Sequence, residues 1–130
     1  DDNFAKIACE AADGAMHAAS LQWRKEAVAC VVLAAEGYPG NPRKGDEITG
    51  IDDALALSGV TVYHAATRRD DDGRLVTSGG RVLSVCGRGA TLAEALDAAY
   101  SGVAKIHFDG MWYRSDIGRD TLTKLGAESG

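Results

Sequence analysis

The sequence predicts a single small α+β domain with a mixed or antiparallel β-sheet. The first observation is length, because 130 residues are typical of one domain. The second is composition: 45% hydrophobic and 25% charged residues suffice for a packed core and argue against wholesale disorder. The third is a series of short strand-like runs, followed by one long amphipathic helical pattern at residues 91–106.

The N-terminal part predicts one helix and two strands. Residues 2–12 place apolar side chains at helical spacing, and Gly14 is a plausible stop. Residues 21–23 predict a brief strand. Residues 26–35 are apolar after Glu26 and rich in Val, which predicts a strand buried on both faces.

The middle of the chain predicts a long loop and a series of short strands. Residues 37–50 hold four glycines and both prolines, and loops of this length are usually functional or disordered. Residues 52–58 predict a helical turn and residues 60–65 a strand. The charged run 68–74 ends in Asp-Gly, a strong hairpin-turn signal. Strands are then expected at 75–77 and 81–86, joined by a glycine-rich link.

The helix at 91–106 has the clearest start signal. Thr91 and Glu94 have the spacing of a capping box, in which each side chain satisfies a free backbone N–H of the first turn. An apolar stripe follows at helical spacing. Residues 108–112 then predict an apolar strand or loop, and residues 120–125 a last helical turn.

Charge and hydropathy exclude some classes of partner. A net charge of −5 argues against nonspecific binding of nucleic acid, although it allows a local basic pocket for a small phosphate. The longest apolar run, at 27–35, is too short to cross a membrane, and the N-terminus has no signal-peptide pattern. We therefore expect a cytoplasmic location. The chain begins without Met inside a helical pattern, so we expect a piece of a longer protein.

The cysteines give no metal or disulfide signature. Cys9, Cys30 and Cys86 are widely spaced, odd in number and form no CxxC motif, which argues against a zinc site or a disulfide framework. Cys30 and Cys86 lie in apolar runs. We expect them to be small buried side chains in a reducing compartment.

The loop around Lys44 is the first candidate anion site. It combines glycines and prolines with Arg43, Lys44 and Asp46, and glycines let backbone N–H groups approach a ligand closely. Lysine can supply a point charge for a phosphate. The loop does not match the phosphate-binding loop pattern of nucleotide-binding proteins. A solvated surface loop is the alternative reading.

The segment Gly79-Gly80-Arg81 is the second candidate. Two glycines clear space beside a guanidinium group, which can bind phosphate or carboxylate through two parallel hydrogen bonds. A β-bulge with an exposed arginine is the alternative. The two candidates together suggest an anion-binding surface formed by Lys44, Gly79, Gly80 and Arg81.

No catalytic or metal-ligating set is expected in this chain. The run at residues 70–72 has three aspartates, but a solvated turn explains it better than a metal site, which needs ligands from several directions. His17, His64 and His107 show no ligand spacing. Asp46 and Glu47 are adjacent and would point in opposite directions on an extended chain.

Several of these segments together resemble one enzyme family. They are similar, in order, to the C-terminal region of the phosphoribosylamine–glycine ligases (glycinamide ribonucleotide synthetases). The matching segments are Glu36-Gly37-Tyr38-Pro39-Gly40, Lys44-Gly45-Asp46, Ile48-Thr49-Gly50, Val62-Tyr63-His64-Ala65, residues 73–85, Ile106, Gly110-Met111, Tyr113-Arg114 and Asp116-Ile117-Gly118. The sequence departs from the pattern at Ala66, at Asp120 and at Cys86-Gly87-Arg88.

The resemblance implies a function for the whole enzyme. This family of ATP-grasp ligases joins 5-phosphoribosylamine to glycine in purine synthesis, with ATP and Mg²⁺, through an acyl phosphate of glycine. It implies a barrel-sandwich-like C-terminal domain that closes one side of the active site. Lys44, Gly79, Gly80 and Arg81 would then face the phosphorylated substrate, and Lys44 and Arg81 would bind its 5-phosphate.

The resemblance also implies what lies outside the chain. Residues 1–20 would be the end of the ATP-grasp domain and residues 21–130 the C-terminal domain. The N-terminal and ATP-grasp regions would be its partners and would hold ATP and metal, so this chain alone would hold no cofactor and be inactive. The alternative is a non-catalytic structural, carrier or assembly module of a larger protein.

Overall fold

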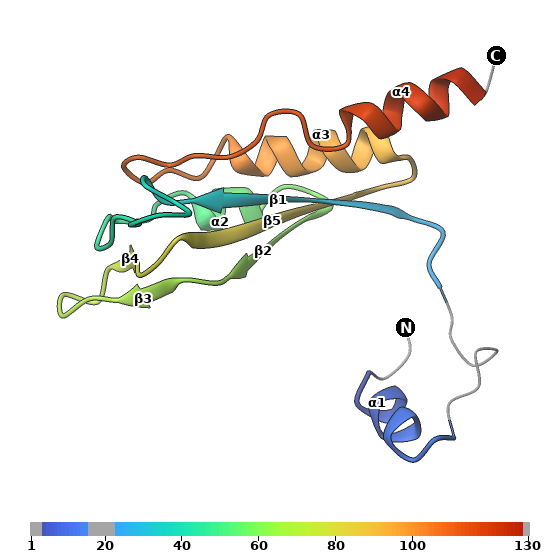
Figure 1. The fold of residues 1–130 in the computed structure, drawn as a ribbon, viewed down its shortest axis with the longest axis horizontal. Helices are drawn as coiled ribbons and strands as arrows, with labels where there is room; N and C mark the ends of the chain where they lie inside the picture. The colour runs from blue at the N-terminus through green and yellow to red at the C-terminus, as the bar shows by residue number, and fades with distance from the viewer. Residues whose placement is uncertain (1–3, 16–22, 129–130) are drawn as a thin grey trace.

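The computed structural model describes residues 4–15 and 23–128 and shows a small α+β domain with antiparallel sheets, as the sequence predicts. Figure 1 shows the order of its elements along the chain. The elements are α1 (Phe4–Ala12), β1 (Ala27–Ala34), α2 (Ile51–Leu55), β2 (Val60–His64), β3 (Thr67–Arg69), β4 (Leu75–Thr77), β5 (Arg81–Gly89), α3 (Leu92–Val103) and α4 (Arg119–Glu128).

The strands form two antiparallel sheets. The larger sheet has the order β1-β5-β2, so β5 is hydrogen-bonded on both edges. The smaller sheet is the hairpin β3-β4, with its turn at 70–74 as the Asp-Gly signal predicts. The chain passes directly from β2 into β3, and from β4 through Ser78-Gly79-Gly80 into β5. The glycine pair therefore links the two sheets.

The core lies between the larger sheet and α3. Figure 1 shows α3 along one face of this sheet. Glycine at position 87 allows this close packing, because a Cβ there would lie 2.2 Å from the Ala95 carbonyl oxygen. The largest fully buried apolar side chains come from the strands, from α3 and from the segment after it: Val31, Leu33, Val82, Leu83, Val85, Val103 and Phe108.

The prediction that β1 is buried on both faces is wrong for the described structure. Its side chains alternate between inside and outside: Val31 is fully buried, whereas Val28 is 59% and Val32 41% exposed. The reason is that α3 covers one face of the sheet only. The prediction of a buried side chain is wrong for Cys30, which is exposed, and only partly right for Cys86, which is partly buried.

The helix α3 is shorter than the predicted span of 91–106. The Thr91 cap is as expected, because the Thr91 hydroxyl accepts a hydrogen bond from the Glu94 N–H at 3.2 Å. The second bond of the predicted capping box differs: the Glu94 carboxylate accepts from the N–H of Ala90, one residue before Thr91, at 2.8 Å. One side of the helix is buried. It ends early because the chain turns so that His107 can pair with Thr49.

Other boundaries differ by a few residues. The strand β5 continues to Gly89, past the predicted end at 86, and α4 is longer than the single turn predicted. Of the strand predicted at 21–23, residues 21–22 lie outside the described part and Trp23 is in no strand. No helix within residues 4–15 and 23–128 has both the length and the apolar character needed to cross a bilayer.

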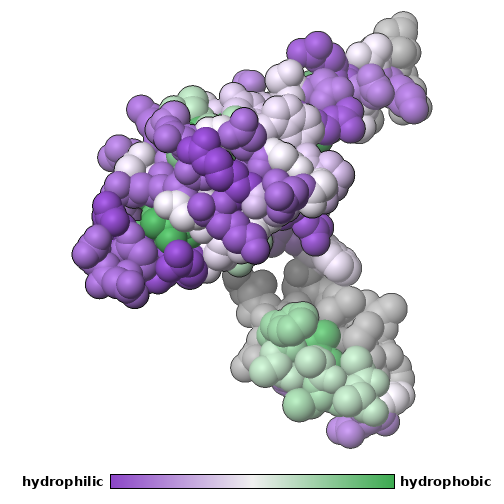
Figure 2. All heavy atoms as spheres, turned by 60° about the vertical axis from the view of Figure 1, so that its left-hand side comes forward, coloured by the Kyte–Doolittle hydropathy of each residue, from purple (hydrophilic) through white to green (hydrophobic). Residues whose placement is uncertain are grey.

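The helix α1 has no buried residue. Phe4 is 80% exposed, and Figure 2 shows a largely hydrophobic surface over this helix, in contrast to the mostly hydrophilic surface over the sheets. The helix α1 therefore differs from α3, one side of which is buried in the core.

Candidate functional site

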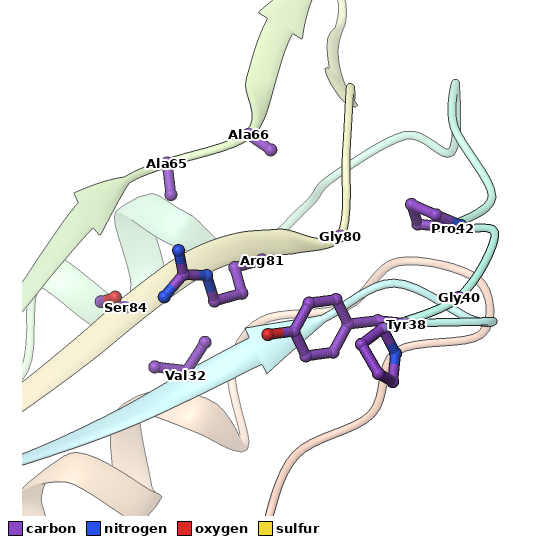
Figure 3. A pocket seen from close by; sticks show the side chains of 10 residues that line it. Val32, Tyr38, Gly40, Pro42, Ala65, Ala66, Gly80, Arg81 and Ser84 are labelled. Carbon is purple, nitrogen blue, oxygen red and sulfur yellow. The ribbon is translucent and has the colours of Figure 1, made fainter.

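A pocket of about 690 Å³ opens at the start of β5. Figure 3 shows Arg81 and Ser84 on β5, with Val32 on β1 and the Tyr38 ring on the loop that follows it. The remaining lining residues are Pro39, Gly40, Pro42, Ala65, Ala66 and Gly80. The walls are thus largely apolar, with one guanidinium group and two hydroxyl groups.

Backbone hydrogen bonds fix Gly80 and Arg81 in this position. The Ala35 N–H donates to the Gly80 carbonyl oxygen at 2.8 Å, and the Ala66 N–H donates to the Arg81 carbonyl oxygen at 2.9 Å. The register of β1 and β5 shifts at this point, where Ala34 pairs with Arg81. The segment is therefore held from both sides before any ligand binds.

Gly80 makes room for the aromatic wall of the pocket. A Cβ at this position would lie 2.4 Å from Cδ2 of Tyr38, closer than any real contact of that kind. Glycine therefore allows the Tyr38 ring to lie directly against the backbone that precedes Arg81. Gly79 has a similar but milder role, because its Cβ would lie 3.0 Å from the Cβ of Ala66.

Arg81 is exposed and available to a ligand. In the described part of the chain, its side chain has no recorded ion pair or hydrogen bond. In Figure 3 its guanidinium group extends along β5 toward Ser84. A guanidinium without a carboxylate partner, beside a hydroxyl and apolar walls, suits a phosphate or carboxylate carried on a small organic group.

Arg43, in the Lys44 loop, is in the opposite situation. Its Nε donates to Asp46 Oδ1 at 2.8 Å, and its other nitrogens contact Glu36 at 3.1 Å and Asp109 at 3.4 Å. The hydrogen bond with Asp46 raises the pKa of Arg43 above its ordinary value, against a lowering by desolvation. Three carboxylates already occupy this guanidinium, so it serves the loop's structure.

Lys44 is exposed and does not line the pocket. The backbone of its loop nevertheless lies beside the second candidate segment. The Gly45 N–H donates to the Thr77 carbonyl oxygen at 2.8 Å, and the Asp46 N–H donates to Thr77 Oγ1 at 3.1 Å. These two hydrogen bonds tie the loop with Lys44 to Thr77, at the end of β4 and directly before the glycine link. Gly80 and Arg81 alone of the four predicted residues line the pocket.

A second cavity, of about 260 Å³, adjoins the first. Both are lined by Arg81, Tyr38 and Val32, and the second also by Cys30 and Arg114, among others. Arg114 forms a two-point ion pair with Asp116, with Nε–Oδ1 at 2.9 Å and a second nitrogen–oxygen contact at 2.8 Å. This hydrogen-bonded pair raises the pKa of Arg114 and lowers that of Asp116.

Sequence reasoning missed Tyr38 and Ser84 as pocket residues. A signal existed for Tyr38, because an aromatic residue stands there among glycine and proline, which are typical turn residues. The Tyr38–Pro39 peptide bond is cis. Ser84 had no such signal, since its role depends on the face of β5 that it occupies.

Two polar groups that the sequence singled out have local partners. The Asp70 carboxylate accepts hydrogen bonds from the Asp72 and Arg74 N–H groups at 3.1 and 2.8 Å, which closes the hairpin turn. Desolvation would raise the pKa of Asp70, but the hydrogen bonds from Arg74 lower it overall. His64 Nδ1 lies 3.1 Å from the Thr67 hydroxyl. Across the residues described, no three His, Cys, Asp or Glu side chains group as a metal site would require.

Comparison with known protein families gives a match to the region that holds the two sheets and the pocket. The family described as phosphoribosylglycinamide synthetase, C domain, matches residues 28–120, which include both sheets, α3 and the whole pocket. This match begins one residue after the start of β1 and ends in α4.

Individual proteins similar to this chain carry a name from the same enzyme family. The chain is 50% identical over 119 residues to phosphoribosylamine–glycine ligase of Caulobacter vibrioides, which covers 91% of this chain and 28% of that protein. It is 51% identical over 102 residues to the Synechocystis ligase of the same name, covering 78% and 24%.

A solved structure is also similar. The crystal structure of phosphoribosylamine–glycine ligase from Thermotoga maritima superposes with a TM-score of 0.73 at 38% identity, over 88% of this chain and 27% of that one. The chain therefore spans about a quarter of the length of these relatives.

Proposed function

The chain belongs to the phosphoribosylglycinamide synthetase C-domain family, and from this premise we propose that it forms the C-terminal part of a phosphoribosylamine–glycine ligase. The reaction proposed for the whole enzyme joins 5-phosphoribosylamine and glycine at the expense of ATP, a step of purine synthesis. This chain would supply one wall of the substrate site. The observation that carries the proposal is the free Arg81 guanidinium in a family-matched pocket.

Arg81 is proposed to bind the 5-phosphate of phosphoribosylamine. A guanidinium group and a phosphate can form two parallel charge-assisted hydrogen bonds, which fix orientation as well as position. Gly79 and Gly80 would let the backbone and the Tyr38 ring approach the ligand closely. Lys44 would act from outside the pocket, as a nearby positive charge that attracts the phosphorylated substrate.

The contribution of such a wall is positional. Holding two reactants in register removes much of the entropic cost of bringing them together. We assign ATP and Mg²⁺, which the family resemblance implies for the whole enzyme, to regions outside this chain. The enzyme is proposed to work in the cytoplasm.

The proposal includes the finer domain assignment. Residues 1–20 would end the ATP-grasp domain, and residues 21–130 would form a barrel-sandwich-like C-terminal domain with its amphipathic helix within 91–106. Two observations support this boundary: the uncovered apolar surface of α1, and a family match that starts only at residue 28.

A chimeric ligase tests the proposal. Residues 1–130 would replace the matching C-terminal part of the Caulobacter vibrioides enzyme, which aligns over 119 residues. We expect the chimera to form glycinamide ribonucleotide from phosphoribosylamine, glycine and ATP, and the 130-residue chain alone to form none. A folded but inactive chimera, or turnover by the isolated chain, would overturn the proposal.

The alternative, a carrier or assembly module, has less support. A carrier domain needs a lysine or serine displayed at a hairpin tip for modification. The tip between β3 and β4 is Asp70–Gly73, which contains neither residue. A purely structural module would also predict that changes at Arg81 leave substrate affinity of the chimera unaltered.

A further inference from the structure

Two thiols lie side by side on the face of the larger sheet opposite α3. Cys30 on β1 and Cys86 on β5 are direct partners in the antiparallel register. Cys30 is exposed and Cys86 is partly buried. Figure 1 shows α3 on the other face of these strands. Both thiols therefore lie on the side of the sheet that α3 leaves uncovered.

The hydrogen bonds of β5 show how close the pair is. The Arg88 N–H donates to the Gly59 carbonyl oxygen, and the Val82 carbonyl oxygen accepts from the Ala65 N–H. The even-numbered residues of β5 therefore direct their backbone N–H and C=O groups toward β2 and not toward β1. Cys86 is one of these residues. Its pairing with Cys30 on β1 is therefore of the non-hydrogen-bonded type.

This type of pair brings side chains closest together. In non-hydrogen-bonded antiparallel pairs the Cα atoms are about 4.5 Å apart, whereas hydrogen-bonded pairs are about 5.5 Å apart. A disulfide needs a Cα separation of roughly 4.4–6.8 Å. The two cysteines thus meet the distance requirement at its near end, without any rearrangement of the strands.

We propose that Cys30 and Cys86 form a redox-active dithiol, which a peroxide converts into an intramolecular cross-strand disulfide. The Cys30 sulfur attacks one oxygen of the peroxide, giving a sulfenic acid and one molecule of water. The Cys86 sulfur then attacks the Cys30 sulfur and displaces the second oxygen as water. Two thiols are oxidised to one disulfide, and one hydrogen peroxide is reduced to two waters.

The environment of the two sulfurs assigns these roles. Burial raises the pKa of the Cys86 thiol to about 11, and a hydrogen bond and a charge interaction with Cys30 act in the same direction. Cys86 is thus held as a thiol at neutral pH, which makes it the poorer nucleophile toward peroxide and leaves the first attack to Cys30. Cys30 is the more exposed of the two and lines the second cavity, so it is the sulfur that a peroxide from solution meets first.

Peptide mapping after oxidation tests the proposal. The full 130-residue chain is reduced, treated with hydrogen peroxide at neutral pH, alkylated, and digested without reduction. We expect one peptide pair linked through Cys30 and Cys86, with an alkylated Cys9 and a loss of two hydrogens from the intact mass. Dithiothreitol should reverse the product completely.

Single substitutions provide the controls. Cys9→Ser should leave the linked peptide unchanged, since Cys9 lies on α1. Cys30→Ser and Cys86→Ser should each abolish it, and in Cys86→Ser the oxidised Cys30 should accumulate as sulfenic or sulfinic acid.

Three results would overturn the proposal. They are free alkylation of both Cys30 and Cys86 after oxidation, independent overoxidation of both, and products linked between chains. Each can be read from the unsubstituted chain, so the outcome does not depend on how well a variant folds. The proposal also does not rest on the ligase function, because neither the reagent nor the readout involves a substrate.

Discussion

Arg43 lies in the loop that follows β1 and Arg81 lies at the start of β5, where the glycine link ends, yet the side chains of these two arginines have different surroundings. Arg43 contacts the carboxylates of Glu36, Asp46 and Asp109. Arg81 lines a pocket, and the described structure records no partner for it. The loop with Lys44 and the segment Gly79-Gly80-Arg81 both combine glycine with a positive charge, and both belong to regions that resemble the same ligase family.

The difference shows what makes a cation available to a ligand. A guanidinium that already holds carboxylates must give up those contacts before it can bind a substrate anion, whereas a free one gives up only water. Two glycines differ in a similar manner, one shaping the backbone and the other making room at the pocket. Gly37, in the Arg43 loop, has φ +84° and faces the Asn41 carbonyl oxygen, so it shapes a turn. Gly80 instead makes room for a ring beside the pocket.

The largest expected effect is that of Arg81→Ala on substrate affinity. Hydrogen bonds to charged groups contribute about 1.5–3 kcal/mol, so the KM of the chimera for phosphoribosylamine should rise roughly 10- to 100-fold. The KM for ATP should stay unchanged. Arg81→Lys keeps the charge without the planar fork, and should give an intermediate KM. Steady-state kinetics measure this, and an unaltered KM in Arg81→Ala would remove the distinction between the two arginines.

Gly80→Ala should have the next largest effect. The new Cβ would meet the Tyr38 ring, and such overpacking costs typically about 1–3 kcal/mol unless the ring moves. Because the ring can move, we expect the pocket to change shape and the KM for phosphoribosylamine to rise roughly tenfold, with a smaller change in melting temperature.

Two further variants sharpen this result. Gly40→Ala changes another glycine of the pocket, but the new Cβ would lie 3.4 Å from its nearest neighbour, the Gly37 carbonyl oxygen. This variant should therefore have little effect on the KM for phosphoribosylamine. Adding Tyr38→Ala to Gly80→Ala removes the clash, and the two changes should therefore not be additive. Full additivity would show that Gly80 and Tyr38 act independently.

Arg43→Ala should affect stability and leave substrate affinity unchanged. It removes the partner of Asp46, whose side chain is only 11% exposed and whose second oxygen, Oδ2, has no hydrogen-bond partner in the described structure. The melting temperature should fall by a few degrees, measured by calorimetry. Adding Asp46→Asn to Arg43→Ala should restore part of the lost melting temperature, because the carboxylate charge left without its arginine partner is then removed. A raised KM at unchanged stability would mean that Arg43 binds substrate after all.

The sequence predicted the elements better than their environment. Local signals located the hairpin turn at 70–74 and the start of α3, because both depend on side-chain-to-backbone hydrogen bonds within a few residues. The burial of β1 could not be obtained in this way. A run of small apolar residues is compatible with a strand covered on both faces and also with a strand covered on one face. Only the position of α3 decides which of the two β1 is.

The site was predicted in the same partial way. The glycine-flanked arginine at 81 was visible as a motif, and the structure places it in a pocket. Which basic residue remains free was not visible. The contact of Arg43 with Asp109 joins residues 66 positions apart, and it depends on how the chain returns after α3. Tyr38 and Ser84 likewise come together only when β1 and β5 pair.

Lys44→Ala should have the smallest effect, and its salt dependence is the informative part. Lys44 is exposed outside the pocket, so its contribution is a long-range attraction, which is screened over about 10 Å at 0.1 M salt. We expect the KM for phosphoribosylamine to rise about twofold at low ionic strength and to match the unsubstituted chimera at high ionic strength. Lys44→Glu should enlarge the effect with the same dependence on salt. A tenfold rise that persists at high salt would instead show direct contact between Lys44 and the phosphate, and would make the two loops equal parts of one site.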